Sequence, residues 1–287
     1  MHHPARALSF VLLSSAVAAC GVEPNDGAER GIAHDVATGE TRADSPVGSG
    51  DGVYAGWTPD GATIKPDTVF GNDGRQQVTP TLAFPASARV RVAAFFSDGH
   101  EGQGTGYMVG NKYLLTAGHV VFSPDHGGFT TSLVAFPAED GDTKPFGKAT
   151  GVVFRTSKAW HDSQDECSDY ALVTLDAQFG DITGWYGLQT LNDGILDNDP
   201  NVTIGGYPTD KPFGTQWQET GPIVDHSDTC LYYNVDTSGG DSGAGVVPDD
   251  GKHEVAAVHD GTDFYNYATR ITSARFDLIL GWIQSGT

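Results

Sequence analysis

The segment TSGGDSGAGVV, from Thr237 to Val247, sets a serine between glycines and directly after an aspartate. The small and β-branched residues at its end are typical of a strand that leaves a tight turn. Glycine adopts positive φ angles and allows the close backbone approach that an oxyanion site needs. The segment therefore predicts Ser242 as a nucleophile, with the backbone N–H groups of Gly240 and Ser242 directed at the oxyanion. A single string of this kind also occurs by chance.

Two further segments supply partners for this serine. In LLTAGHVV, Leu114–Val121, His119 follows an apolar run and a small-residue turn. Its imidazole has the pKa that general-base work near neutrality requires. In CSDYALVTL, Cys167–Leu175, Asp169 stands at the mouth of an apolar strand, and a carboxylate buried beside His119 would fix the imidazole tautomer. Each residue taken singly has a simpler structural role; the three together predict a Ser–His–Asp triad.

The chain order His, Asp, Ser resembles that of the chymotrypsin-fold serine peptidases, and three longer strings resemble the bacterial glutamyl endopeptidase branch. VFGNDGRQQVTPTLAFPASARV (Val69–Val90) is similar to the start of a mature enzyme. GYPTDKPFGTQWQETGPI (Gly206–Ile223) and YATRIT (Tyr267–Thr272) are similar to segments of the second barrel. The resemblance implies an all-β fold of two six-stranded antiparallel β-barrels with a C-terminal helix, and a serine endopeptidase that works through an acyl-enzyme.

Short strand-like runs separated by glycine, proline and aspartate turns agree with this fold. They lie at 88–96, 106–109, 113–115, 133–135, 152–154 and 170–175, and at 201–204, 215–224, 230–235, 243–247, 254–259 and 266–271. A helical pattern closes the chain, with Ser273 as candidate N-cap. We expect the first barrel to span 68–180, with His119 and Asp169, and the second barrel and the helix to span 181–287, with Ser242.

The resemblance also implies a specificity. Thr237 and His259 stand at the positions where the family holds a substrate carboxylate, so cleavage after Glu or Asp is expected. A histidine donates a hydrogen bond to a carboxylate, more strongly when charged. Asp236 lies six residues before Ser242, where trypsin-like relatives bind Arg or Lys, so trypsin-like or broad specificity stays open. A non-catalytic binding module and an esterase on the same fold are further alternatives.

One residue beside this pocket complicates an acidic specificity. Asp260 directly follows His259, and its charge would repel an acidic substrate, although neighbouring strand residues normally point to opposite faces. In some relatives the mature α-amino group is an additional cation at the pocket. Here it would come from Thr68 or Val69.

The N-terminal part of the chain predicts a signal for export. Residues 1–20 combine Arg6 with an apolar run too short to span a bilayer. The end of this run, residues 17–20, fits a lipobox with Cys20 as the lipidated residue; an ordinary secretory signal is the alternative. Residues 21–67 show no sustained hydrophobic period and predict a disordered propeptide or linker. We therefore expect an extracellular or cell-envelope location, with membrane attachment if Cys20 carries lipid.

With Cys20 removed or lipidated, Cys167 and Cys230 remain as an even pair in an oxidising compartment. A disulfide between the two halves of the chain is the prediction, and two unpaired buried thiols are the alternative.

The charge balance bears on partners. The chain has 37 acidic against 16 basic residues, a formal net charge of −21. This argues against nucleic acid, which is bound by clustered Lys and Arg. The histidines show no HExxH or paired-ligand spacing, so no metal and no cofactor is expected. The expected partners are polypeptide substrates, bound by a monomer.

Overall fold

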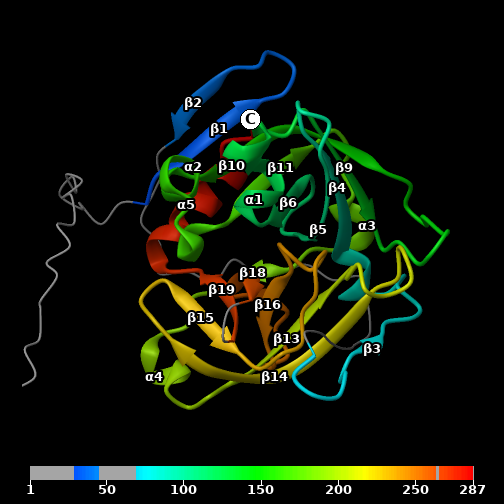
Figure 1. The fold of residues 1–287 in the computed structure, drawn as a ribbon, viewed down its shortest axis with the longest axis vertical. Coiled ribbons are helices and arrows are strands. Elements are labelled where there is room, and N and C mark those ends of the chain that lie inside the picture. Colours follow the sequence, from blue (N-terminus) through cyan, green and yellow to red (C-terminus); the bar gives the residue numbers. More distant parts are fainter. Residues whose placement is uncertain (1–28, 45–68, 263–264, 287) are drawn as a thin grey trace, which may run out of the picture.

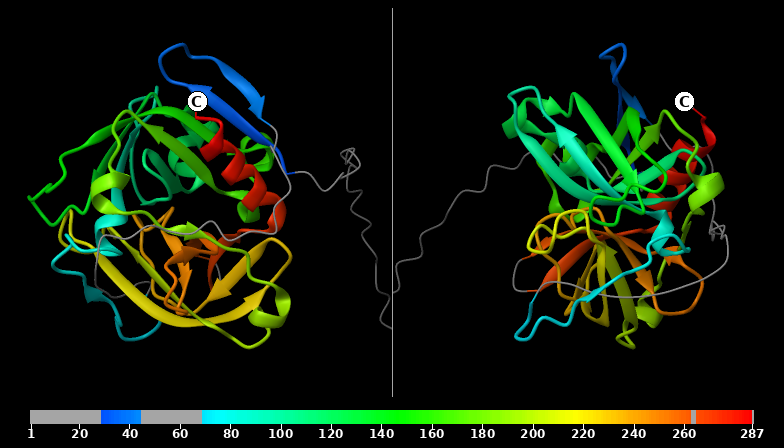
Figure 2. Two further views of the ribbon diagram at one scale, coloured as in Figure 1. Left: turned by 180° about the vertical axis from the view of Figure 1, so that it is seen from behind. Right: turned by 90° about the vertical axis from the view of Figure 1, so that its right-hand side faces the viewer.

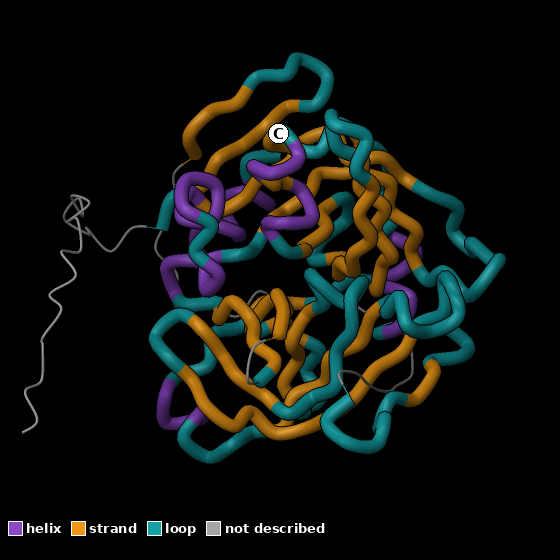
Figure 3. Tube along the Cα trace, in the orientation of Figure 1, coloured by secondary structure: helices purple, strands orange, loops and turns teal. Residues whose placement is uncertain are grey.

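The computed structural model describes residues 29–44, 69–262 and 265–286. The predicted signal peptide, Cys20, Thr68 and the remainder of the segment 21–67 lie outside the described residues. Strands dominate the described part, and they form two barrels stacked one on the other (Figures 1 and 3). No helix in the described part of the chain is long and apolar enough to cross a membrane.

The first barrel contains six antiparallel strands in the order β11, β6, β5, β4, β9, β10, and the pairing of β10 with β11 closes it. Its core is apolar because alternate residues point inward; Val90 and Val92 of β4, for example, are fully buried. The strands are β4 (Arg89–Phe95), β5 (Glu101–Met108), β6 (Tyr113–Thr116), β9 (Ser132–Pro137), β10 (Ala149–Ser157) and β11 (Ala171–Leu175). A small β7–β8 pair, Phe122–Ser123 with Gly128–Phe129, lies beside it.

The second barrel follows the order β13, β16, β18, β19, β15, β14 and is closed by β13 and β14. The strands are β13 (Asn201–Gly206), β14 (Trp217–His226), β15 (Cys230–Tyr233), β16 (Gly245–Pro248), β18 (Ala257–Thr262) and β19 (Asn266–Arg270). Two closed six-stranded barrels confirm the predicted fold class, and each predicted run overlaps a strand. The short strand β3 (Gln76–Gln77) also joins this barrel, by pairing with β14, and β12 (Gly187–Leu188) pairs in parallel with β17 (Glu254–Val255).

The predicted C-terminal helix is α5 (Ser273–Gln284). Thr272, not Ser273, is its N-cap: the Thr272 hydroxyl accepts a hydrogen bond from the Arg275 N–H at 3.4 Å. Although α5 follows the second barrel in sequence, it lies beside the first barrel (Figure 2). Its Trp282 packs beside Tyr170, with ring centroids 6.0 Å apart. The other helices are short: α1 (Gly118–Val121), α2 (Lys158–Ser163), α3 (Gly180–Thr183), α4 (Asp193–Leu196) and the 3-10 turns η1 (Ala86–Ala88), η2 (Pro124–His126) and η3 (Glu166–Ser168).

Residues 29–44 form regular structure that the sequence pattern does not predict. They contain a hairpin of β1 (Gly31–Asp35) and β2 (Thr41–Asp44), drawn in blue in Figure 1. Strand β1 pairs with β10 and so extends the sheet of the first barrel. The strand that β1 pairs with, β10, lies far away in sequence, so the residues around the hairpin do not reveal this pairing.

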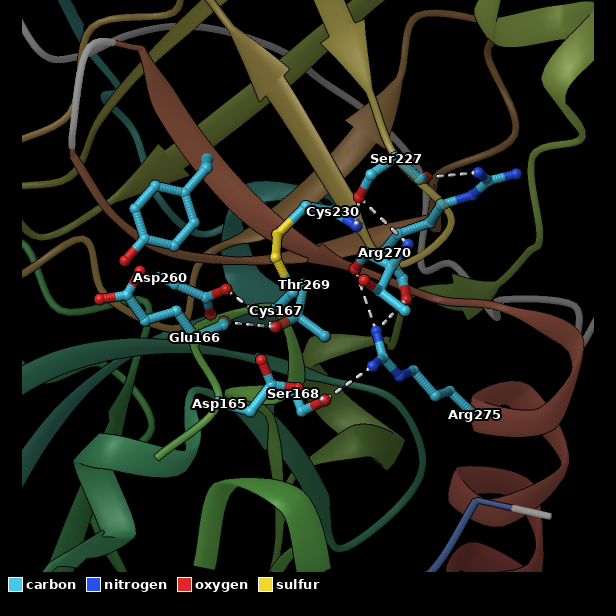
Figure 4. The surroundings of a disulfide bond; sticks show 12 residues. Asp165, Glu166, Cys167, Ser168, Ser227, Cys230, Asp260, Thr269, Arg270 and Arg275 are labelled. Carbon is cyan, nitrogen blue, oxygen red and sulfur yellow. Dashed lines mark hydrogen bonds between the residues drawn. A yellow bond between two sulfur atoms is a disulfide. The ribbon is translucent and has the colours of Figure 1, made fainter. Parts of the chain in front are cut away.

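The predicted disulfide is present and joins the two barrels. Cys167 in η3 and Cys230 in β15 are bonded, with Cα atoms 5.2 Å apart (Figure 4). A second link crosses the interface between the barrels: the buried Arg89 side chain of β4 donates to Tyr186 Oη at 3.0 Å and to Gln216 Oε1 at 3.3 Å. These links fix the relative position of the barrels, and the predicted site residues lie on both.

Candidate active site

Helix α1 and the loop before β11 bring His119 and Asp169 together. Asp169 is buried, and its Oδ1 atom accepts a hydrogen bond from the His119 backbone N–H at 2.7 Å. Its Oδ2 atom lies 2.5 Å from His119 Nδ1. The His119 side chain keeps 34% exposure. The carboxylate thus holds the imidazole at Nδ1, while the other ring nitrogen, Nε2, stays available.

The small residue before His119 is a steric requirement of this contact. A Cβ atom at Gly118 would lie 2.7 Å from Asp169 Oδ1 and 2.7 Å from Trp160 Cδ1. Separations under 3 Å between such atoms require a neighbour to shift. The Ala-Gly-His string is therefore what lets Asp169 reach both the backbone and the ring of His119.

The turn that carries Ser242 is held by glycine geometry and by β5. Gly240 has φ +101° and Gly243 has φ +91°, both in the left-handed region that favours glycine. Thr105 of β5 fixes the turn, because its N–H donates to Ser242 O at 2.9 Å and its hydroxyl to Gly240 O at 2.8 Å. Within the described residues, the backbone N–H groups of Gly240 and Ser242 have no protein acceptor. They are available to an incoming oxygen.

Gly104 of β5 separates the histidine segment from the serine turn. A Cβ atom there would lie 2.8 Å from Val120 Cγ2, next to His119, and 3.1 Å from the Ser242 carbonyl oxygen. The two segments are therefore packed against one strand. Ser242 Oγ and His119 Nε2 are not hydrogen-bonded to each other in this structure, and catalytic hydrogen bonds are often long when no substrate is bound.

The pKa of His119 reflects two opposed effects. Burial lowers it, but the charge of Asp169 and the hydrogen bond that the ring donates to this carboxylate together raise the pKa above its ordinary value of 6.5. The arrangement favours the imidazolium that forms when a histidine takes a proton.

His259 lies in β18, directly behind the serine turn. Gly243 N–H donates to the His259 carbonyl oxygen at 2.7 Å. The His259 ring is buried, with Nδ1 lying 2.6 Å from Tyr233 Oη and 3.2 Å from Tyr267 O. Its Nε2 atom makes no hydrogen bond within the described part of the chain. Burial, with a smaller contribution from the nearby charge of His119, lowers the pKa of His259 to about 3, so the ring is neutral near pH 7.

Comparison with known proteins agrees with these observations. The family model described as Trypsin matches residues 78–283, which is most of the chain. The chain belongs to the trypsin family of serine peptidases. It is therefore a hydrolase, as the resemblance implies.

Two relatives in this family are informative. The chain is 34% identical over 227 residues to the extracellular metalloprotease of Bacillus subtilis strain 168, which covers 77% of this chain and 71% of the relative. It is 32% identical over 228 residues to the glutamyl endopeptidase of Bacillus licheniformis, with 76% and 70% covered. A solved structure of a Glu endopeptidase in complex with MPD superimposes with a TM-score of 0.68 at 22% identity, covering 76% of this chain and all of that one. The predicted glutamyl endopeptidase type is confirmed at the level of family.

The name of the B. subtilis relative raises the question of a metal. Within residues 29–44, 69–262 and 265–286, no group of three or more His, Cys, Asp or Glu side chains is placed to hold a metal ion.

The two acidic residues near the predicted pocket have other partners. The Asp236 carboxylate accepts hydrogen bonds from the Phe70 N–H at 2.7 Å and the Gly74 N–H at 3.1 Å. Asp260 is buried and accepts a hydrogen bond from the Thr269 hydroxyl at 2.8 Å (Figure 4). Burial, together with the charge of Asp169, raises the pKa of Asp260 well above its ordinary value, which weakens the repulsion expected from the sequence.

The remaining predicted site residue, Thr237, is buried next to Asp236. Sequence reasoning missed Tyr233. It follows the strand-forming run CLY in β15 and carries no motif, and the residue that it contacts lies 26 positions further along the chain. Only the pairing of β15 with β19, and of β19 with β18, brings the two together.

Proposed function

We propose that this serine peptidase cleaves polypeptides after Glu or Asp, with Ser242, His119 and Asp169 as its triad. The observation that carries the acidic specificity is His259: a buried, neutral imidazole directly behind the serine turn, held by Tyr233 at one ring nitrogen only. The glutamyl endopeptidases among its relatives support the same substrate class.

The reaction follows from the positions of the three residues. Ser242 Oγ attacks the carbonyl carbon of the scissile bond while His119 Nε2 takes its proton, and Asp169 stabilises the resulting imidazolium. The N–H groups of Gly240 and Ser242 donate to the oxyanion. His119 then protonates the leaving amine, and water hydrolyses the acyl-enzyme by the same steps in reverse.

The proton on His259 decides whether a carboxylate is accepted. A substrate carboxylate needs a donor, so Nε2 must carry the proton and Nδ1 must accept one. Tyr233 Oη, 2.6 Å from Nδ1, donates that hydrogen bond in this tautomer. In the other tautomer Nδ1–H donates and Tyr233 turns its proton to Tyr267 O, 3.1 Å away. Tyr233 is thus a positioning residue that allows the donor form of His259.

Trypsin-like specificity has less support. Both Asp236 carboxylate oxygens accept backbone hydrogen bonds from the segment that follows Val69, and this contact competes with binding of a Lys or Arg side chain. The same contact ties the start of the first barrel segment to the serine turn. It supports a mature chain that begins near Val69, which N-terminal sequencing of the active enzyme tests.

We expect His259→Ala to lower kcat/KM for a Glu substrate by about 100-fold, since a hydrogen bond to a charged group is lost. A matched substrate with Leu before the scissile bond should change by less than about threefold. The measurement is the ratio of kcat/KM for the two substrates. His226→Ala, at a partly buried histidine paired with Asp197, is the control and should leave this ratio unchanged. Equal losses on both substrates would restrict His259 to a structural role.

A second variant separates the tautomer from the imidazole itself. Tyr233→Phe removes the donor to Nδ1, and Nδ1–H then donates to Tyr267 O. We expect KM for the Glu substrate to rise about tenfold with kcat changed little. An unchanged KM would show that Tyr233 does not set the tautomer.

The raised pKa of His119 predicts the acid side of the pH profile. His119 acts as a base only when neutral, so kcat/KM falls as the pH drops through its pKa, which lies above 6.5. His259, with a pKa of about 3, stays neutral in this range, so a single proton controls the change. The check is the pH profile for the Leu substrate, whose side chain does not titrate. A midpoint below 6.5, or a slope of two protons, would contradict the assignment.

Export of the enzyme is part of the proposal. The apolar run of residues 1–20 and the disulfide between Cys167 and Cys230 both agree with a protein that matures outside the cytoplasm. Mass spectrometry of the N-terminal peptide would distinguish a lipidated Cys20 from ordinary signal cleavage.

A further inference from the structure

The N-terminal hairpin occupies an edge of the first barrel that would otherwise be open. Strand β9 pairs with β10 only at Ala149 and Thr150. Beyond them, β1 takes over and pairs with β10 from Val153 to Ser157. Unpaired strand edges attract other strands, so this position is a natural place for strand addition.

Strand β1 of the hairpin packs closely against the rest of the protein. Ile32 and Ala33 of β1 are buried. Gly31 lies flat against α5, where a Cβ atom would overlap the indole ring of Trp282. Figure 2 shows β1 lying beside this helix. On the opposite side, the His34 ring stacks on Phe129, with centroids 4.7 Å apart and planes inclined by 7°.

Backbone hydrogen bonds continue the pairing at both ends of β1. The Lys158 N–H donates to Arg30 O at 2.7 Å, and the Val36 N–H donates to Val152 O at 3.0 Å. At the end of β2, Asp44 Oδ2 lies 3.4 Å from Nε of Arg155, whose side chain is fully buried. The hairpin therefore supplies a carboxylate to a buried cation of the barrel.

Glu29, just before the hairpin, reaches the residues that flank Asp169. Tyr170 Oη donates to Glu29 Oε1 at 3.0 Å, and Arg275 Nε lies 3.6 Å from the same oxygen. Arg275 in turn donates to Ser168 Oγ at 2.8 Å (Figure 4). Glu29 thus contacts Tyr170, which follows Asp169, and reaches Ser168, which precedes it, through Arg275.

We propose that residues 29–44 are a permanent part of the catalytic body, so that hydrolysis of a peptide bond between Asp44 and Val69 leaves the N-terminal fragment bound as a second, non-covalently attached chain. Maturation then cuts the covalent connection between the N-terminal fragment and the catalytic body, while strand β1 stays paired with β10. The inference is independent of the proposed specificity, because it concerns only the fit of β1 to β10 and α5.

The test uses the full chain with Ser242→Ala, which prevents self-cleavage, and a recognition sequence for a site-specific protease in place of residues 54–60. After complete cleavage, native size-exclusion chromatography should recover the N-terminal fragment with the body at a 1:1 ratio. Hydrogen exchange should show the Val36 and Lys158 amides as protected after the cut as before it. Elution of the fragment apart from a folded body, or loss of protection at both amides, would overturn the proposal.

A pair of variants tests the docking geometry. Gly31→Val places side-chain atoms where Trp282 lies and should raise the dissociation constant of the cut fragment at least about tenfold. Glu40→Val adds the same side chain at an exposed position of the same hairpin and should leave it unchanged. Equal retention of both fragments would overturn the assigned packing. If the Gly31→Val chain does not fold, amide exchange in the cut parent protein still decides.

Discussion

Ser242→Ala is expected to lower kcat for peptide hydrolysis by about a millionfold, because the nucleophile is lost while the remaining groups cannot replace it. The fold should be unaffected, since Ser242 Oγ makes no hydrogen bond within the described residues. The turn is held by its backbone, through the Thr105 N–H and the Thr105 hydroxyl. The measurement is turnover of a Glu peptide by the parent and variant proteins after identical processing, with thermal unfolding recorded for both.

Ser238→Ala is the matched control. Ser238 lies in the same turn, and its backbone N–H, which donates to Asp241 Oδ2 at 3.1 Å, survives the substitution. We expect its activity to stay within about threefold of the parent. Turnover by the Ser242→Ala protein within tenfold of the parent, with the unfolding temperature unchanged, would remove Ser242 from the mechanism.

The residues of the proposed triad could be singled out because the packing around them constrains neighbouring residue types. Gly118, Gly240 and Gly243 each stand where a side chain would collide with backbone or with a site residue, and two of them need positive φ. Such requirements place glycines in the sequence close to the proposed functional residues. The short strings around His119 and Ser242 therefore carry information about three-dimensional contacts.

The hairpin, Tyr233 and the contact of Asp236 could not be predicted, and the reason is the same in each case. Their partners lie far away in sequence: β1 pairs with β10, Tyr233 contacts His259, and Asp236 binds the N–H of Phe70, 166 positions away. None of these contacts imposes a local hydrophobic period. Asp236 also shows that one sequence position can serve two purposes. It stands six residues before Ser242, where trypsin-like relatives bind a substrate cation, but here its carboxylate accepts hydrogen bonds from backbone N–H groups.

Asp169→Asn is expected to lower kcat near neutral pH by about ten-thousandfold. The carboxamide oxygen still accepts from the His119 N–H, but its NH₂ group then faces Nδ1 and donates to it. The imidazole must hold its proton on Nε2, where it can no longer accept one from Ser242. Asp162→Asn, at an exposed carboxylate paired with Lys158, is the control and should change kcat by less than about twofold.

Two further measurements on Asp169→Asn distinguish an electrostatic role from a structural one. The pKa of His119, followed by NMR, should fall, because the charge of Asp169 raises it in the parent. Asp260 should respond as well. Its raised folded-state pKa makes the parent lose stability as the pH rises above the ordinary value of 3.8, and removing the Asp169 charge should narrow the pH range over which this loss occurs. A purely structural role would lower activity without moving either titration, so an unchanged His119 pKa would contradict the triad even if kcat fell.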